Sequence, residues 1–78
     1  MDILDLMAQM EQYGTLVAFA PHWKDSYKTV VIVKLDEPDK NDNEYYVLIW
    51  NDVDRTHKIW HSSATWTTAS ISFGNLKK

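Results

Sequence analysis

Hydrophobic residues at the start of the chain recur every three or four positions, and after residue 14 this period shortens. The hydrophobic residues of the first segment fall on one face of a helix and are Ile3, Leu6, Met7, Met10 and Tyr13. Asp2 is suited to cap the first turn, and Gly14 is suited to end the helix. This pattern predicts a helix over residues 2–13.

From Thr15 onward, hydrophobic and β-branched residues form short runs between polar or proline-containing segments, as antiparallel strands do. Short connections between such runs favour strands that are neighbours in sequence order. The chain therefore predicts a single α+β domain over residues 1–78, in which an N-terminal helix packs on a four- to five-stranded antiparallel meander sheet. The expected strands cover residues 15–20, 27–35, 44–50, 55–61 and 65–73.

The expected sheet is hydrophobic on both faces, since residues 45–50 are hydrophobic throughout. A four-residue turn at 51–54 would place Trp60 on the face of Tyr45, and an odd-length turn would place it on the face of Tyr46. A helix of this length is about 18 Å long and about 10 Å wide, so it covers one face only. Three arrangements would close the other face: a sheet curled into a half-barrel, a second copy of the chain, or a partner protein.

A large uncovered hydrophobic face usually marks an interface, so this face is the expected partner-binding surface. The residues assigned to it are Val30, Ile32, Tyr46, Trp50, Trp60 and Trp66. An acidic loop is the second candidate, either as a docking loop for a basic partner or as a solvated hairpin loop that favours solubility. Its carboxylates are Asp36, Glu37, Asp39, Asp42 and Glu44.

The composition narrows the range of functions. The chain has no cysteine, which excludes disulfides and thiolate chemistry and fits a reducing cytoplasm. His57 and His61 would lie about 13 Å apart along a strand, too far to share a metal ion. The chain shows no catalytic or phosphate-binding motif, no signal-peptide pattern and no apolar run near the roughly 20 residues of a membrane helix. We expect a cytoplasmic protein that is not an enzyme, with no cofactor, no bound metal and no membrane partner.

The leading hypothesis is a non-enzymatic protein-binding module that uses the uncovered sheet face or an edge strand. Its general character is that of the small regulators and inhibitors by which phages and mobile elements bind host proteins. The alternative is a single-stranded nucleic-acid-binding protein, in which Trp60, Tyr46 and Trp66 stack on bases. Lys28 and Lys58 would then contact phosphates. The net charge of −3 opposes that alternative. A homodimeric structural protein and a small metal-dependent or acid–base enzyme are the remaining hypotheses.

Overall fold

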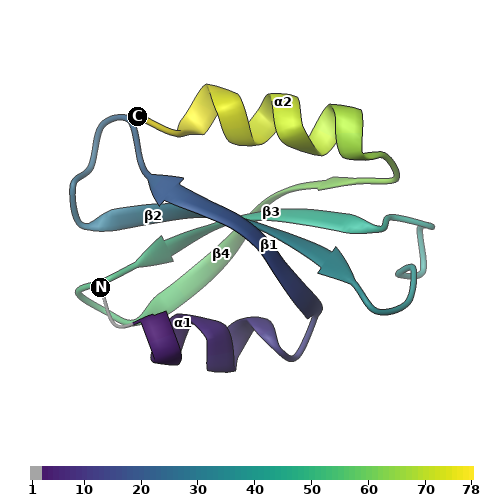
Figure 1. Cartoon of the computed structure of the whole chain (residues 1–78), viewed down its shortest axis with the longest axis horizontal. Coiled ribbons are helices and arrows are strands. Elements are labelled where there is room, and N and C mark those ends of the chain that lie inside the picture. The colour runs from purple at the N-terminus through teal and green to yellow at the C-terminus, as the bar shows by residue number, and fades with distance from the viewer. Residues whose placement is uncertain (1–2) are drawn as a thin grey trace.

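The computed structural model describes residues 3–78 and shows one four-stranded antiparallel sheet between two helices (Figure 1). The strand order is β1-β2-β3-β4, so each strand pairs with its neighbour in sequence. This confirms the predicted α+β meander with its N-terminal helix. The sheet is open: its edge strands, β1 and β4, do not pair with each other. The elements are α1 (Ile3–Met10), β1 (Gly14–Pro21), β2 (Lys28–Leu35), β3 (Tyr45–Asn51), β4 (Thr56–Ser63) and α2 (Trp66–Leu76).

The prediction of a fifth strand over residues 65–73 is wrong: these residues lie within α2 and its N-cap. Thr65 has extended backbone angles, φ −126° and ψ 150°, and its side chain accepts a hydrogen bond from the N–H of Thr68. Ala69 is fully buried, and Phe73 and Leu76 pack beside it. This spacing of four and seven residues is that of one helical face. Burial of that face against the sheet outweighs the strand preference of its Thr, Ile and Trp residues.

The remaining element boundaries differ little from those predicted. Each of the four predicted strands agrees with the structure to within two residues at either end. The helix α1 ends at Met10, and residues 11–13 form a turn. Gly14 begins β1 without a positive φ, so it is not a left-handed helix cap. The predicted cap at Asp2 lies outside the described residues.

Two hydrophobic cores lie on opposite sides of the sheet. Because β2 is an inner strand covered on both faces, its successive residues contribute alternately to each core. The core under α1 consists of Leu6, Met10, Val31, Val33, Leu48 and Trp50. The core under α2 consists of Val30, Ile32, Val47 and Ala69. The second face of the sheet is therefore closed by a helix of the same chain.

Each helix crosses its face from one corner of the sheet to the opposite corner. At its start α1 lies beside the β3–β4 turn, where Asp5 is 3.5 Å from Arg55, and it leads into Gly14 at the far end of β1. The helix α2 follows β4 and ends beside β1, where the N–H of Trp23 donates to the carbonyl of Leu76 at 2.8 Å. A helix that runs diagonally leaves two corners of its face without cover.

Candidate functional site

An open cleft of about 220 Å³ lies at the corner of the sheet that α2 leaves uncovered. Cross-strand pairing joins Lys28 of β2 to Asn51 of β3, and Asn51 to Thr56 of β4. Ile49, in the next row, pairs with Lys58. These side chains share one face of the sheet because directly paired residues point to the same side. We call this the Trp60 cleft; its lining residues are Lys28, Ile49, Asn51, Thr56, His57, Lys58 and Trp60.

Trp60 is the large hydrophobic side chain of this cleft, and 53% of it is exposed. Its position follows from an irregularity in β4: His61 pairs with Val47 and Ile59 pairs with Leu48, so Trp60 has no partner in the ladder. Such a bulge redirects side chains and is common beside functional sites. The ammonium group of Lys58 lies 5.6 Å from the centre of the Trp60 ring system, within cation–π range.

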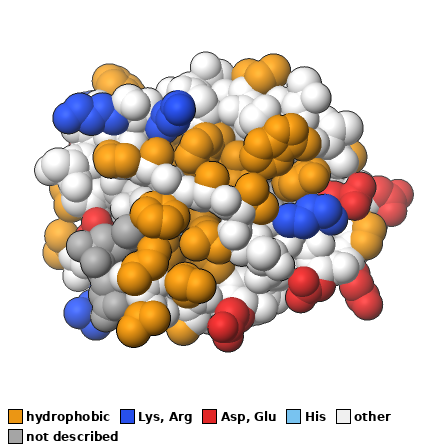
Figure 2. Space-filling model, in the orientation of Figure 1, with side chains coloured by type: hydrophobic (Ala, Val, Ile, Leu, Met, Phe, Trp, Pro, Cys, Tyr) orange, Lys and Arg blue, Asp and Glu red, His pale blue; other side chains and the backbone are white. Residues whose placement is uncertain are grey.

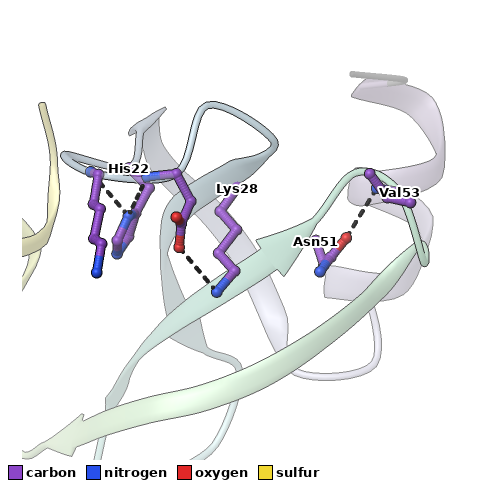
Figure 3. A network of polar contacts seen from close by, with 6 residues as sticks. His22, Lys28, Asn51 and Val53 are labelled. Carbon is purple, nitrogen blue, oxygen red and sulfur yellow. Dashed lines mark hydrogen bonds and ion pairs between the residues drawn. The ribbon is translucent and has the colours of Figure 1, made fainter.

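The turns next to the cleft are held by hydrogen bonds from side chains to the backbone (Figure 3). In the β1–β2 turn, His22 Nδ1 accepts from the N–H groups of Lys24 at 3.2 Å and Asp25 at 3.1 Å. In the β3–β4 turn, Asn51 Oδ1 accepts from the N–H groups of Val53 at 2.9 Å and Asp54 at 3.0 Å. Both turns are thus ordered by local contacts, and the cleft between their strands is formed in advance of any ligand.

A second open cleft, of about 260 Å³, occupies the corner that α1 leaves uncovered. Phe19, which is 46% exposed, and Pro21 line it from β1. Asp52 lines it from the β3–β4 turn, and its buried Oδ1 has no hydrogen-bond partner within residues 3–78. Lys28 borders this cleft as well as the Trp60 cleft.

The edge strand β1 carries no charged residue, and hydrophobic side chains gather over β1 and α1 on the face shown in Figure 2. Charged side chains and bulges are the usual protection of a free edge against pairing with other chains. Here a bulge between Leu16 and Ala18 interrupts the regular edge. At the other end of β1, the N–H of Lys78 donates to the carbonyl of Pro21 at 2.8 Å. The chain therefore shortens its own free edge, leaving the stretch before Pro21 open.

Comparison of the chain with protein-family models, curated proteins and solved structures found no match. The site is therefore interpreted from its own geometry.

The structure separates the six residues assigned to the expected partner-binding surface. Val30 and Ile32 are 0% exposed and Trp50 is 1% exposed, so this part of the assignment is wrong: these side chains form the cores under the two helices. Tyr46 is half-buried and packs against the core under α1. Trp66 lies on α2, with its ring 5.7 Å from that of residue 45. A docking face of all six does not exist, because α2 covers Val30 and Ile32 on one face of the sheet, whereas Tyr46 and Trp50 pack under α1 on the other.

The nucleic-acid hypothesis had grouped Trp60 with Lys28 and Lys58, and these three do line one cleft. Its other stacking residues lie elsewhere, since Tyr46 packs on the opposite face and Trp66 is on α2. The polar lining residues Asn51 and Thr56 were missed. They pair with each other and flank the observed turn at 52–55, and the register of that turn decides which side chains join Trp60.

Both ring nitrogens of His57 have side-chain partners in the N-terminal segment. His57 Nε2 is 2.7 Å from the hydroxyl of Tyr13, and its Nδ1 is 2.9 Å from Oε1 of Gln9, so both ring nitrogens tie β4 to the α1 end of the chain. No three His, Asp or Glu side chains of residues 3–78 are grouped as metal ligands. Within the same range, neither helix has the length and hydrophobicity needed to cross a bilayer.

The acidic loop is organised around one carboxylate, that of Asp39. Its oxygens accept from the N–H groups of Asn41 at 2.9 Å and Asn43 at 3.0 Å, from the Asn43 amide at 3.2 Å and from the Tyr46 hydroxyl at 2.8 Å. The N–H of Asn43 is the main cause that lowers the pKa of Asp39 from 3.8 to about 2, and the bond to Asp39 raises the pKa of Tyr46. Of the other loop carboxylates, Glu44 pairs with Lys34 at 3.2 Å, while three are exposed to solvent: Asp36, Glu37 and Asp42.

We expect the loop to lose its order in acid at an unusually low pH. The folded pKa of Asp39, about 2, lies below its ordinary value of 3.8, so its contribution to stability is present above about pH 4 and is lost as the pH falls towards 2. NMR titration of the Asn41 and Asn43 amides should show a transition near pH 2. Asp39→Asn should abolish this transition, and a midpoint near pH 4 in the native protein would contradict the assignment.

Proposed function

We propose that this protein is a non-enzymatic protein-binding module that anchors its partner at the Trp60 cleft. The observation that carries the proposal is a half-exposed Trp60 beside an open cleft with Ile49 among its lining residues. Tryptophan is enriched among the few interface residues that dominate binding energy, and such residues cluster around well-packed pockets. Burying one aromatic side chain removes about 150–250 Å² of surface from water. Covering the indole of Trp60 therefore gives the largest gain in buried area that a single side chain of the cleft can provide.

The fold leaves Trp60 exposed although it buries another tryptophan fully. Trp50 is 1% exposed in the core under α1. Trp60 lies in a bulge of β4, and its side chain lines the cleft on the opposite face, at the corner that α2 does not reach. Because the turns next to the cleft are already ordered, less conformational entropy is lost on binding. A module that binds without a catalytic group acts by occupying its partner, so we propose a role as a regulator or inhibitor.

Substituting Trp60 by Ala should release the partner while leaving the fold intact. The tagged protein is expressed in its native host, and the co-purifying proteins are quantified by mass spectrometry. We expect the specific partner to fall by about tenfold or more, since loss of a hot-spot residue costs about 2 kcal/mol or more.

Trp66→Ala is the matched control for this experiment. Trp66 is 46% exposed, close to the 53% of Trp60, but does not line the cleft. The control should retain the partner, and both variants should keep the amide NMR spectrum of the folded protein. Retention of the partner by Trp60→Ala, or equal loss in both variants, would sink the proposal.

Single-stranded nucleic acid is the second candidate ligand, favoured by the presence of Trp60, Lys58 and Lys28 in one cleft. Stacking on an indole and contact with ammonium groups are the two interactions such proteins use. Quenching of tryptophan fluorescence by an oligothymidylate, reversed by added salt, would support this candidate. Unchanged fluorescence at low salt would exclude it.

A further inference from the structure

We infer that the Trp60 cleft takes an acidic peptide segment, with one hydrophobic side chain of the segment beside Ile49 and Trp60 and its carboxylates at Lys58 and Lys28. This inference rests on the proposed function and adds the chemistry of the partner. It follows from the charge, the size and the aromatic content of the cleft.

The lining of the cleft is cationic although the chain is acidic. Lys28 and Lys58 line it, no carboxylate of residues 3–78 does, and the chain as a whole has a net charge of −3. Lys28 already pairs with Asp25 at 3.1 Å. Lys58 belongs to none of the ion pairs of residues 3–78, and its ammonium group lies over Trp60. A carboxylate of the partner would thus meet one unpaired and one paired ammonium group beside an indole.

Apart from Asp25, which already pairs with Lys28, the carboxylates of the acidic loop lie too far from the cleft to cancel this charge. Lys28 pairs with Asn51 at one end of β2, whereas Lys34, at the acidic-loop end, pairs with Tyr45. The six residue steps from Lys28 to Lys34 span about 20 Å of strand, roughly twice the screening length at physiological salt. Asp52, on the nearby turn, lines the cleft on the opposite face.

The size of the cleft favours a single anchoring side chain. Its volume of about 220 Å³ lies below the range of about 300–1,000 Å³ that is usual for small-molecule sites. Among the residues described, Trp60 is the one Trp, Tyr or Phe that lines it. Single-strand nucleic-acid sites stack successive bases on several aromatic side chains. One indole beside a small cleft therefore fits a peptide with one hydrophobic residue between acidic residues.

Short synthetic peptides test this inference by NMR of the full chain. The reporter is the indole N–H signal of Trp60, identified by its loss in Trp60→Phe. The probes are a peptide with glutamates around a central Phe, the same peptide with a central Ala, a peptide with lysines around a central Phe, and an oligothymidylate. We expect the Glu/Phe peptide to shift the Trp60 signal, with an affinity that falls as salt is added. The Ala and Lys peptides should bind at least about tenfold more weakly.

Lys58→Glu should weaken binding of the Glu/Phe peptide by about tenfold or more, because it places a carboxylate beside the incoming ones. Lys40→Glu is the matched control: it makes the same change in net charge in the acidic loop, at the other end of the sheet. No shift with the Glu/Phe peptide, equal binding of the Lys/Phe peptide, no effect of Lys58→Glu, or tighter binding of the oligothymidylate would each overturn the inference.

The same variant separates this inference from the proposed function when it is used in the capture experiment. Loss of the partner in both Trp60→Ala and Lys58→Glu supports both statements. Loss in Trp60→Ala with full retention in Lys58→Glu leaves the cleft as the docking site and overturns the acidic segment. Retention in Trp60→Ala overturns the proposed function, whatever the peptides do.

Discussion

Replacing Trp50 with Ala should lower the free energy of unfolding by about 3–5 kcal/mol, through lost burial and the cavity left behind. Trp50 is 1% exposed and is the largest fully buried side chain, packed in the core under α1. Domains of this kind are stable by only about 5–15 kcal/mol, so the variant should retain little of its stability or none. Urea unfolding followed by far-ultraviolet circular dichroism measures the change without relying on the removed fluorophore.

The exposed tryptophans supply the comparison. Trp60→Ala and Trp66→Ala should each cost much less than Trp50→Ala, since these side chains are 53% and 46% exposed in the folded protein. If Trp60→Ala destabilised the fold as much as Trp50→Ala, Trp60 would be a core residue and its proposed role in binding would fail.

Gly14→Ala should cost about 3 kcal/mol or more, although it adds a single methyl group. A Cβ at residue 14 would overlap the carbonyl oxygen of Lys34 and lie 2.8 Å from the nitrogen of Asp36 and 2.9 Å from the Cα of Leu35. All three are backbone atoms, so no side-chain rotation relieves the overlap and the start of β1 must move away from β2. Urea unfolding gives the free energy, and the Asp36 amide, which donates to the carbonyl of Tyr13 at 3.2 Å, reports the local displacement.

The other glycine of the chain is a direct control. At Gly74, within α2, an added Cβ meets no atom within 4 Å. Gly74→Ala should therefore stabilise the protein by about 0.5–1 kcal/mol, because alanine loses less conformational freedom in a helix. Equal effects of the two substitutions would show that close packing at Gly14 is not what requires glycine there.

Periodicity was sufficient to predict α1, and runs of hydrophobic and β-branched residues were sufficient to predict the four strands. The uninterrupted hydrophobic run of β2, residues 30–33, reflects its position between two cores. The helix α2 was missed because polar and hydrophobic residues alternate over part of it and because Thr, Ser and Trp favour strands. The signal that identifies it is present but weak: Thr65 as a cap, followed by Ala69, Phe73 and Leu76 on one face.

The sequence was sufficient to predict that both faces of the sheet need a cover. It was not sufficient to predict that a second helix, α2, covers the second face. Missing α2 moved Val30 and Ile32 from the core to an expected surface. Trp50 was misplaced for another reason: the register of β2 and β3, which pairs it with Thr29, puts it on the α1 face.

For Trp60, the sequence was compatible with either face of the sheet. The observed pairing of Asn51 with Thr56 leaves a four-residue turn at 52–55, and Trp60 lines the same cleft as Ile49. The bulge at residue 60 depends on how β3 and β4 fit together, and no local pattern indicates it.

The two cores are completed at different times during synthesis of the chain. The core under α1 can form once β1 to β3 have left the ribosome, because its helix is already available. The face formed by Val30, Ile32 and Val47 has no cover from α2 until residues 66–76 have emerged as well. Nascent chains with such exposed hydrophobic surface are prone to aggregate and engage chaperones. An open hydrophobic sheet face, which the folded protein lacks, is thus present on the nascent chain during synthesis.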